Sequence, residues 1–192
     1  MDSLYLEPQG FLGTGASLLA DLTLIAYIFL IVPGMLAGWV MARRGAHRPQ
    51  HKFVMNTITL VNWVLILLLM MVAYNFDIAD NIGEQPGNAR YLVPTIHALL
   101  GIPAQLLATY IVFRMWREDT QVARAKQRGE TDFEKYWFKN AKWMMQLTLA
   151  LWLATAAFGV ITYTIRYDVI DGFNFGDDDT SEIAPLATED FD

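Results

Sequence analysis

The stretch FVMNTITLVNWVLILLLMMVAY, residues 53–74, runs for 22 residues without a charged side chain. About 20 apolar residues in an α-helix cross the roughly 30 Å hydrocarbon core of a bilayer. The apolar residues form a continuous block, whereas a helix on a soluble core carries only an apolar stripe. The stretch therefore predicts a transmembrane helix and excludes a soluble globular protein.

Three further blocks have the same character, and 54% of the 192 residues are hydrophobic. The predicted fold is therefore all-α, an integral membrane four-helix bundle that occupies residues 1–167. Its expected spans are Leu18–Met41, Phe53–Tyr74, Tyr91–Phe113 and Trp143–Tyr163. Residues 168–192 form a separate acidic tail, which has nine of the twenty Asp and Glu residues and no Lys or Arg. The net charge of −6 thus belongs to the tail.

The basic residues predict the orientation of the bundle. Twelve of the fourteen Lys and Arg residues lie in two connections, between the first and second spans and between the third and fourth. Such loops face the cytoplasm by the positive-inside rule. We therefore expect a multi-pass membrane protein with both termini on the outer side. Residues 1–17 have no basic residue, so we expect the first span to be retained rather than cleaved as a signal.

The connection between the third and fourth spans predicts further helices. A polar helical run ends at Gly129, and Thr131 to Glu134 has the pattern of a capping box. These features indicate a cytoplasmic helical hairpin extension between the last two spans. Two interpretations stay open: the hairpin packs on itself, or it is a docking surface for a cytoplasmic partner.

Polar groups inside the hydrocarbon region are functional candidates, because they are costly there. The candidates are Asp21, Asn56, Asn62, His97, Gln105 and Gln146. Asp21 lies three residues inside the first span and His97 six residues inside the third, so both lie about 5–9 Å below the outer boundary. We expect that they can meet as an intramembrane carboxylate–imidazole pair. Asn56 and Gln146 lie near the inner boundary, where amide hydrogen bonds between helices are expected.

Histidine supplies the candidate cofactor-binding residues. His97 either hydrogen-bonds a neighbouring helix in its neutral form or ligates haem or a metal, and Met70 and Met71 lie at a similar depth. His47 and His51 precede the second span, where they either contact lipid headgroups or hold haem propionates or a metal. They lie about 24 Å of helix from the depth of His97, so all three cannot bind one ion.

Catalytic signatures do not occur in the sequence. The chain has no cysteine and therefore no disulfide, thiolate metal site or CxxCH haem attachment. It also has no Walker loop, GxGxxG or GxSxG motif, and its basic loops have no nucleic-acid-binding signature. We therefore expect a non-catalytic protein rather than an enzyme.

Three segments together resemble a known family. They are His47-Arg-Pro-Gln-His51-Lys-Phe-Val-Met55, the span with Tyr91, His97 and Pro103, and Thr148-Leu-Ala-Leu-Trp152-Leu followed by Gly159-Val-Ile-Thr-Tyr163. From about residue 25 to 165 the chain resembles the bacterial four-helix membrane proteins of the domain of unknown function 420 family, related to CtaM and YozB.

The resemblance implies a role with haem–copper oxidases and leaves two expectations open. One is a transient maturation factor that contacts haem or a metal through His47, His51 and His97. The other is a structural accessory subunit of a respiratory or photosynthetic electron-transfer complex, with subunits of that complex and the lipid bilayer as its partners. The family has a further histidine at the start of the last span, where this chain reads Lys139-Asn140-Ala141-Lys142. That difference favours the accessory subunit.

Overall fold

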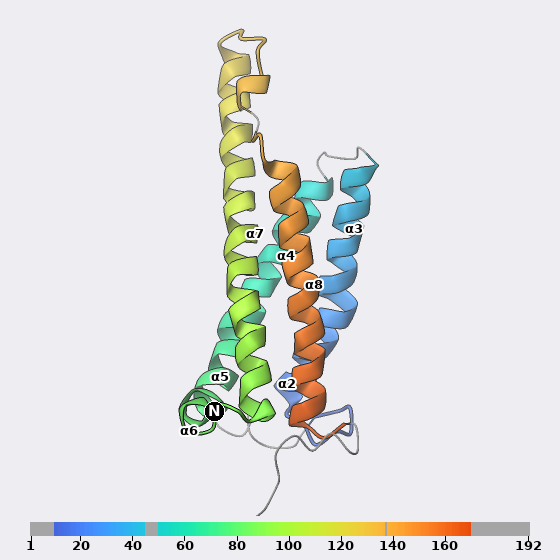
Figure 1. Cartoon of the computed structure of the whole chain (residues 1–192). Coiled ribbons are helices and arrows are strands. Elements are labelled where there is room, and N and C mark those ends of the chain that lie inside the picture. Colours follow the sequence, from blue (N-terminus) through green and yellow to red (C-terminus); the bar gives the residue numbers. More distant parts are fainter. Residues whose placement is uncertain (1–9, 45–49, 137, 170–192) are drawn as a thin grey trace, which may run out of the picture.

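The computed structural model describes residues 10–44, 50–136 and 138–169, and within these ranges it is helical with no strand (Figure 1). The first long helix consists of α2 (Leu18–Ala26), η1 (Tyr27–Ile31) and α3 (Val32–Arg43). The second consists of α4 (Gln50–Leu65), η2 (Ile66–Met70) and α5 (Met71–Asp77). The short α6 (Ala79–Glu84) leads to the third, α7 (Ala89–Gln127). A single 3-10 turn, η3 (Glu134–Tyr136), precedes the fourth, α8 (Ala141–Arg166).

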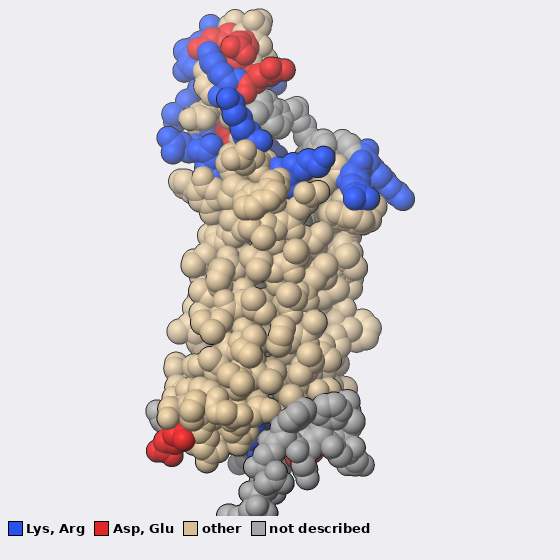
Figure 2. All heavy atoms as spheres, viewed as in Figure 1, with Lys and Arg blue, Asp and Glu red and all other residues tan. Residues whose placement is uncertain are grey.

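All four long helices have the length and apolar composition needed to cross a membrane, as the sequence predicts. The helices are longer than the apolar blocks because helical structure continues into the polar flanks. Large apolar side chains are exposed around the bundle, with Phe29, Phe53 and Leu60 at 73%, 72% and 67%. A soluble monomer rarely exposes such a continuous apolar surface. Figure 2 shows it as a tall band without Lys, Arg, Asp or Glu.

The four long helices form a ring in which each contacts two others. α7 and α8 make the most extensive contact, α3 packs on α4, α4 on α7, and α2 on α8. Small residues permit close approach: a Cβ added at Gly34 would lie 2.6 Å from Ile58 Cδ1 across the α3–α4 contact. The common core includes Ile31, Met35, Ile58, Leu65, Ala104, Ala108 and Trp152.

The two ends of the bundle differ in charge. Arg43, Arg44 and Lys52 lie at the end formed by the last turn of α3 and the first turn of α4, which we call the basic end. Figure 2 shows that Lys and Arg gather at this end of the molecule. The end with residues 10–17, α6 and the last turn of α8 is the opposite end (Figure 1).

Beyond the basic end, α7 continues past the other three long helices as the α7 extension, residues 114–127 (Figure 1). It ends at Gly129, whose φ of 75° is the left-handed conformation that favours glycine after a helix. The expected returning helix is absent from the described residues, which contain only η3 there. The prediction of a helical hairpin is therefore wrong in its second arm.

Chain length accounts for the missing helix. Phe138 packs edge-on against Tyr110, with ring centroids 6.1 Å apart, and lies beneath Arg114. α7 rises about 21 Å from Arg114 to Arg128, whereas a helix from Gly129 to Phe138 would descend only about 14 Å. One continuous helix would therefore be too short to bring Phe138 back to the bundle.

Two π-helical turns, η1 and η2, interrupt the first and second long helices. The sequence offers a cause for η1. Pro33 has no N–H for the carbonyl of Phe29, so the regular α-helical hydrogen bond is missing at η1. π-helical turns occur frequently at functional sites.

Candidate functional site

A cavity of about 610 Å³ lies among the four long helices, in the half of the bundle toward the opposite end. Its volume falls within the range of about 300–1,000 Å³ that is typical of small-molecule sites. Its wall is mainly apolar and includes residues of both π-helical turns, such as Tyr27 and Met70. The polar residues in the wall include Asn62, His97, Thr155 and Tyr163.

His97 is held by the neighbouring helix α8. Its Nδ1 lies 2.9 Å from the backbone oxygen of Thr155. A carbonyl oxygen can only accept, so Nδ1 carries the proton and Nε2 of the neutral ring keeps its lone pair. Nε2 has no hydrogen-bond partner in the described part of the chain, and His97 lines the cavity. A Cβ at Gly159 would lie 3.1 Å from His97 Cε1, so this glycine leaves the room for the ring.

Asp21 and His97 take different partners, and the expected carboxylate–imidazole pair does not form. Asp21 is fully buried, and its Oδ1 accepts a hydrogen bond of 2.5 Å from Tyr163 Oη. Its Oδ2 accepts one of 2.8 Å from the backbone N–H of Leu12. The hydroxyl of Thr14 lies 2.5 Å from the same Tyr163 oxygen. Asp21 therefore fastens residues 10–17 to α8.

A second polar chain crosses the centre of the bundle. Tyr27 Oη donates to Asn62 Oδ1 at 2.5 Å, and Asn62 Nδ2 donates to Gln105 Oε1 at 2.8 Å. Gln105 Nε2 then donates to the backbone oxygen of Thr59 at 3.0 Å. These contacts join the first, second and third long helices. We call Tyr27, Asn62 and Gln105 the amide chain.

Asn56 and Gln146, the two amides that were expected to form hydrogen bonds between helices, do not form them with the described residues. Gln146 is exposed on α8 and forms no hydrogen bond with the described residues. Asn56 Oδ1 is buried and has no partner there. The prediction of interhelical bonds at Asn56 and Gln146 is therefore wrong for the described residues, since Gln146 lies on the exposed surface and Asn56 Oδ1 meets no donor.

The other two candidate histidines belong to the basic end. His51 is buried, and its Nδ1 lies 3.0 Å from the backbone oxygen of Gly38, so it joins the first two long helices. It does not line the cavity. His47 lies outside the described residues. In the part of the chain that the structure describes, no three His, Cys, Asp or Glu side chains gather as a metal site.

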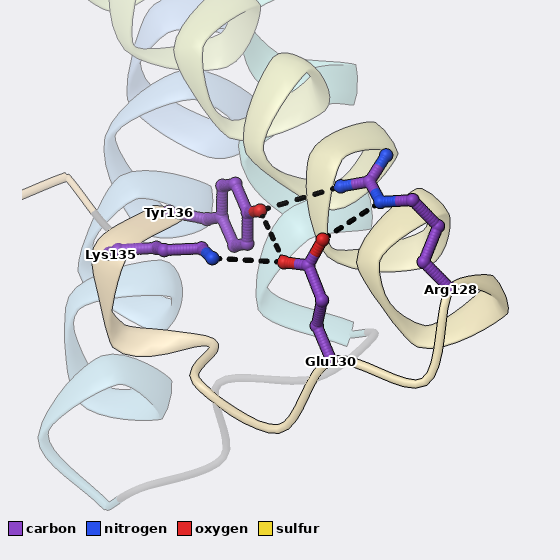
Figure 3. Close-up of polar contacts among 4 residues, drawn as sticks. All are labelled: Arg128, Glu130, Lys135 and Tyr136. Atoms are coloured by element: carbon purple, nitrogen blue, oxygen red, sulfur yellow. Dashed lines mark hydrogen bonds and ion pairs between the residues drawn. The ribbon is translucent and has the colours of Figure 1, made fainter.

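A polar cluster closes the tip of the α7 extension (Figure 3). Glu130 accepts hydrogen bonds from Arg128 Nε at 2.8 Å, Lys135 Nζ at 2.9 Å and Tyr136 Oη at 2.8 Å. The bonds from Lys135, Tyr136 and Arg128, in that order of effect, lower the pKa of Glu130 to about 2. Nearer the bundle, Lys52 pairs with Asp119. These contacts fix the extension and its returning segment.

The sequence does not single out Tyr27 or Tyr163 as partners of the buried polar residues, or Trp152 as part of the cavity wall. Each is an aromatic residue within an apolar block, and such residues ordinarily fill a core. The signal that could have found Tyr163 is its hydroxyl at the depth of Asp21, near the outer boundary. Comparisons of the chain with models of protein families, with curated proteins and with solved structures find no match.

Proposed function

We propose that the chain is a non-catalytic accessory subunit of a membrane electron-transfer complex, which it joins through the α7 extension. It lies in the bacterial cytoplasmic membrane, with the basic end on the cytoplasmic side and both termini outside. The positive-inside rule supports this orientation. The resemblance to the domain of unknown function 420 family supports the class of complex.

The observation that carries this proposal is the α7 extension. It continues about 20 Å beyond the residues at the base of α8 and is held by the polar cluster at its tip. Arg117 and Arg124 are exposed and seven residues apart, so they lie on one face of the helix. Neither takes part in an ion pair within the described residues. The extension is thus a basic surface that suits an acidic partner surface.

The contacts within the bundle agree with a structural role. Asp21, Asn62 and Gln105 form hydrogen bonds with other parts of the same chain. These bonds stabilise the packing of the helices.

Purification of the tagged protein in mild detergent tests the proposal. We expect subunits of one electron-transfer complex to copurify in a one-to-one ratio by quantitative mass spectrometry. The double variant Arg117→Glu/Arg124→Glu should lose these subunits, because it reverses the charge of the extension. Lys139→Glu/Lys142→Glu is the matched control, since both residues are exposed at the base of α8 rather than on the extension. Equal loss in both variants, or no stoichiometric partner, would contradict docking through the extension.

A second candidate is the transient maturation factor for a haem–copper oxidase. The observation that favours it is the presence of His97 and Met70 in the wall of one cavity. Imidazole and thioether are a known axial pair for haem iron, so the donors present fit haem. Haem bound there would supply one-electron chemistry, while His97 and Met70 would hold the iron.

An absorbance spectrum of the purified protein after addition of haemin tests this candidate. A Soret band that shifts on binding and is lost in His97→Ala, but kept in His51→Ala, would support it. Substoichiometric copurification of oxidase subunits would support it over the stable subunit.

A further inference from the structure

We propose that the cavity among the four long helices binds a lipid-soluble hydroquinone, whose hydroxyl group donates a hydrogen bond to His97 Nε2. Hydroquinone binding goes beyond the proposed function and is independent of it, because it involves the cavity and not the α7 extension. Only reversible binding is proposed, with no change in the oxidation state of the ligand.

The wall of the cavity suits an apolar ring and tail. It has a volume of about 610 Å³ and is lined mainly by aliphatic and aromatic side chains. Leu99 and Ile102 belong to the wall and are 66% and 56% exposed, so the cavity borders the apolar outer surface of the bundle. A ligand dissolved in the bilayer can therefore reach it without crossing water.

His97 supplies one acceptor in this apolar wall. The bond from Nδ1 to the oxygen of Thr155 places the proton on Nδ1, which leaves Nε2 as an acceptor without a partner in the described chain. His97 is half-buried and lines the cavity, so Nε2 is accessible to a donor placed there. A ligand hydroxyl group would supply that donor.

Trp152 supplies an independent observation at the same cavity. Its side chain is 96% buried, since its exposed fraction is 4%, and its indole N–H has no partner among the described residues. The hydroxyl of Thr162, also in the cavity wall, is buried and unpartnered in the same way. An indole N–H can only donate, so it requires an acceptor. The cavity wall thus has an unpaired acceptor on α7, His97 Nε2, and two buried unpaired groups on α8, Trp152 Nε1 and Thr162 Oγ1.

The acceptor His97 Nε2 and the donor Trp152 Nε1 together indicate the class of ligand. Trp152 and Thr162 lie about 4.5 Å and 10 Å along α8 on either side of Thr155, which holds His97. A hydroquinone has a hydroxyl on each side of an apolar ring, so one can donate to His97 while the other accepts from Trp152. A phospholipid acyl chain has neither group and would leave both unpaired.

The test uses decyl-benzohydroquinone and its dimethyl ether as probes. The ether has nearly the same apolar body but no hydroxyl donor. Each is added to the delipidated full-length protein in detergent under anaerobic conditions, and binding is measured by equilibrium dialysis. We expect the hydroquinone to bind about tenfold more tightly than the ether, because the ether cannot donate a hydrogen bond to His97 Nε2.

Variants distinguish the contribution of the hydrogen bond to His97 from the contribution of the apolar cavity to binding. His97→Leu should weaken hydroquinone binding to the level of the ether, and His97→Gln should restore part of it through its side-chain carbonyl. Ala156→Leu should abolish binding of both probes, because Ala156 lines the cavity. Ala157→Leu is its control, since the neighbouring residue is exposed and does not line the cavity.

Equal binding of the hydroquinone and the ether would overturn the proposal and assign the cavity to a lipid chain. No saturable binding of the hydroquinone would also overturn it. A haem absorbance band in the purified protein that depends on His97 would assign the cavity to the second candidate function instead. If His97→Leu does not fold, as judged by circular dichroism, the comparison of the two probes on the unchanged protein decides.

Discussion

Replacement of Gln105 by leucine tests whether the amide chain holds the first three long helices together. Gln105 is 1% exposed, accepts from Asn62 Nδ2 at 2.8 Å and donates to the oxygen of Thr59 at 3.0 Å. Leucine has a similar volume but forms neither bond, and Asn62 Nδ2 is left as a buried donor without a partner. The variant therefore removes hydrogen bonding with little change in packing.

The magnitude follows from these two bonds. Hydrogen bonds between membrane helices contribute about 0.6 kcal/mol each on average, so their loss costs about 1.2 kcal/mol. An unpaired buried donor adds about 1 kcal/mol or more, the lower end of the usual range. We expect Gln105→Leu to lower the free energy of unfolding by about 2 kcal/mol.

The assay is reversible unfolding in mixed micelles, in which the fraction of sodium dodecyl sulfate is raised and helicity is followed by circular dichroism. Gln146→Leu is the matched control, because Gln146 is exposed on the surface of α8 and forms no hydrogen bond with the described residues. That change should alter stability by less than about 0.5 kcal/mol. If Gln105→Leu is as stable as the control, the amide chain does not stabilise the bundle.

Three further predictions concern other contacts. Gly34→Ala should destabilise the bundle in the same assay, because the added Cβ would lie 2.6 Å from Ile58 Cδ1. Gly87→Ala is the control and should leave stability unchanged, since a Cβ there has no neighbour within 4 Å. Equal effects of the two variants would exclude the close contact at Gly34. The pKa of Glu130 is lowered to about 2, so its contribution to the tip of the α7 extension is complete above its unfolded pKa of about 4.5 and is lost as pH falls toward 2. The NMR signals of the Tyr136 ring should therefore shift over that pH range, and a Glu130→Gln variant that shifts equally would contradict this. Tyr163→Phe should speed chymotrypsin cleavage after the exposed Phe11, because it removes the bond that fastens residues 10–17 to α8; an unchanged rate would argue against that role.

The α7 extension and the expected hairpin show where sequence patterns succeed and fail. Gly129 marks the end of α7 correctly, because a helix end depends on local backbone conformation. The capping-box pattern from Thr131 to Glu134 predicts a helix that does not form beyond η3. The packing of Phe138 against Tyr110 requires a longer reach than a helix of that length provides.

For the intramembrane polar residues too, the sequence predicts one property and not another. Hydropathy identifies Asp21, Asn62, His97 and Gln105 as unusual, but it does not identify their partners. Asn62 and Gln105 meet, whereas Asn56 and Gln146 do not take part in such a bond. His97 bonds to a backbone oxygen of α8, and backbone groups have no signature in the sequence.

The sequence by itself determined the number of long apolar helices, their approximate ends and the charge difference between the two ends of the bundle. These properties are sums along a continuous segment, and they do not change when a helix rotates about its axis. The tertiary structure decided that Asp21 bonds to Tyr163, that the amide chain forms, and that His97 lines a cavity. Those contacts depend on the rotation of each helix and on the neighbour it faces, which are set by the packing of all four helices together.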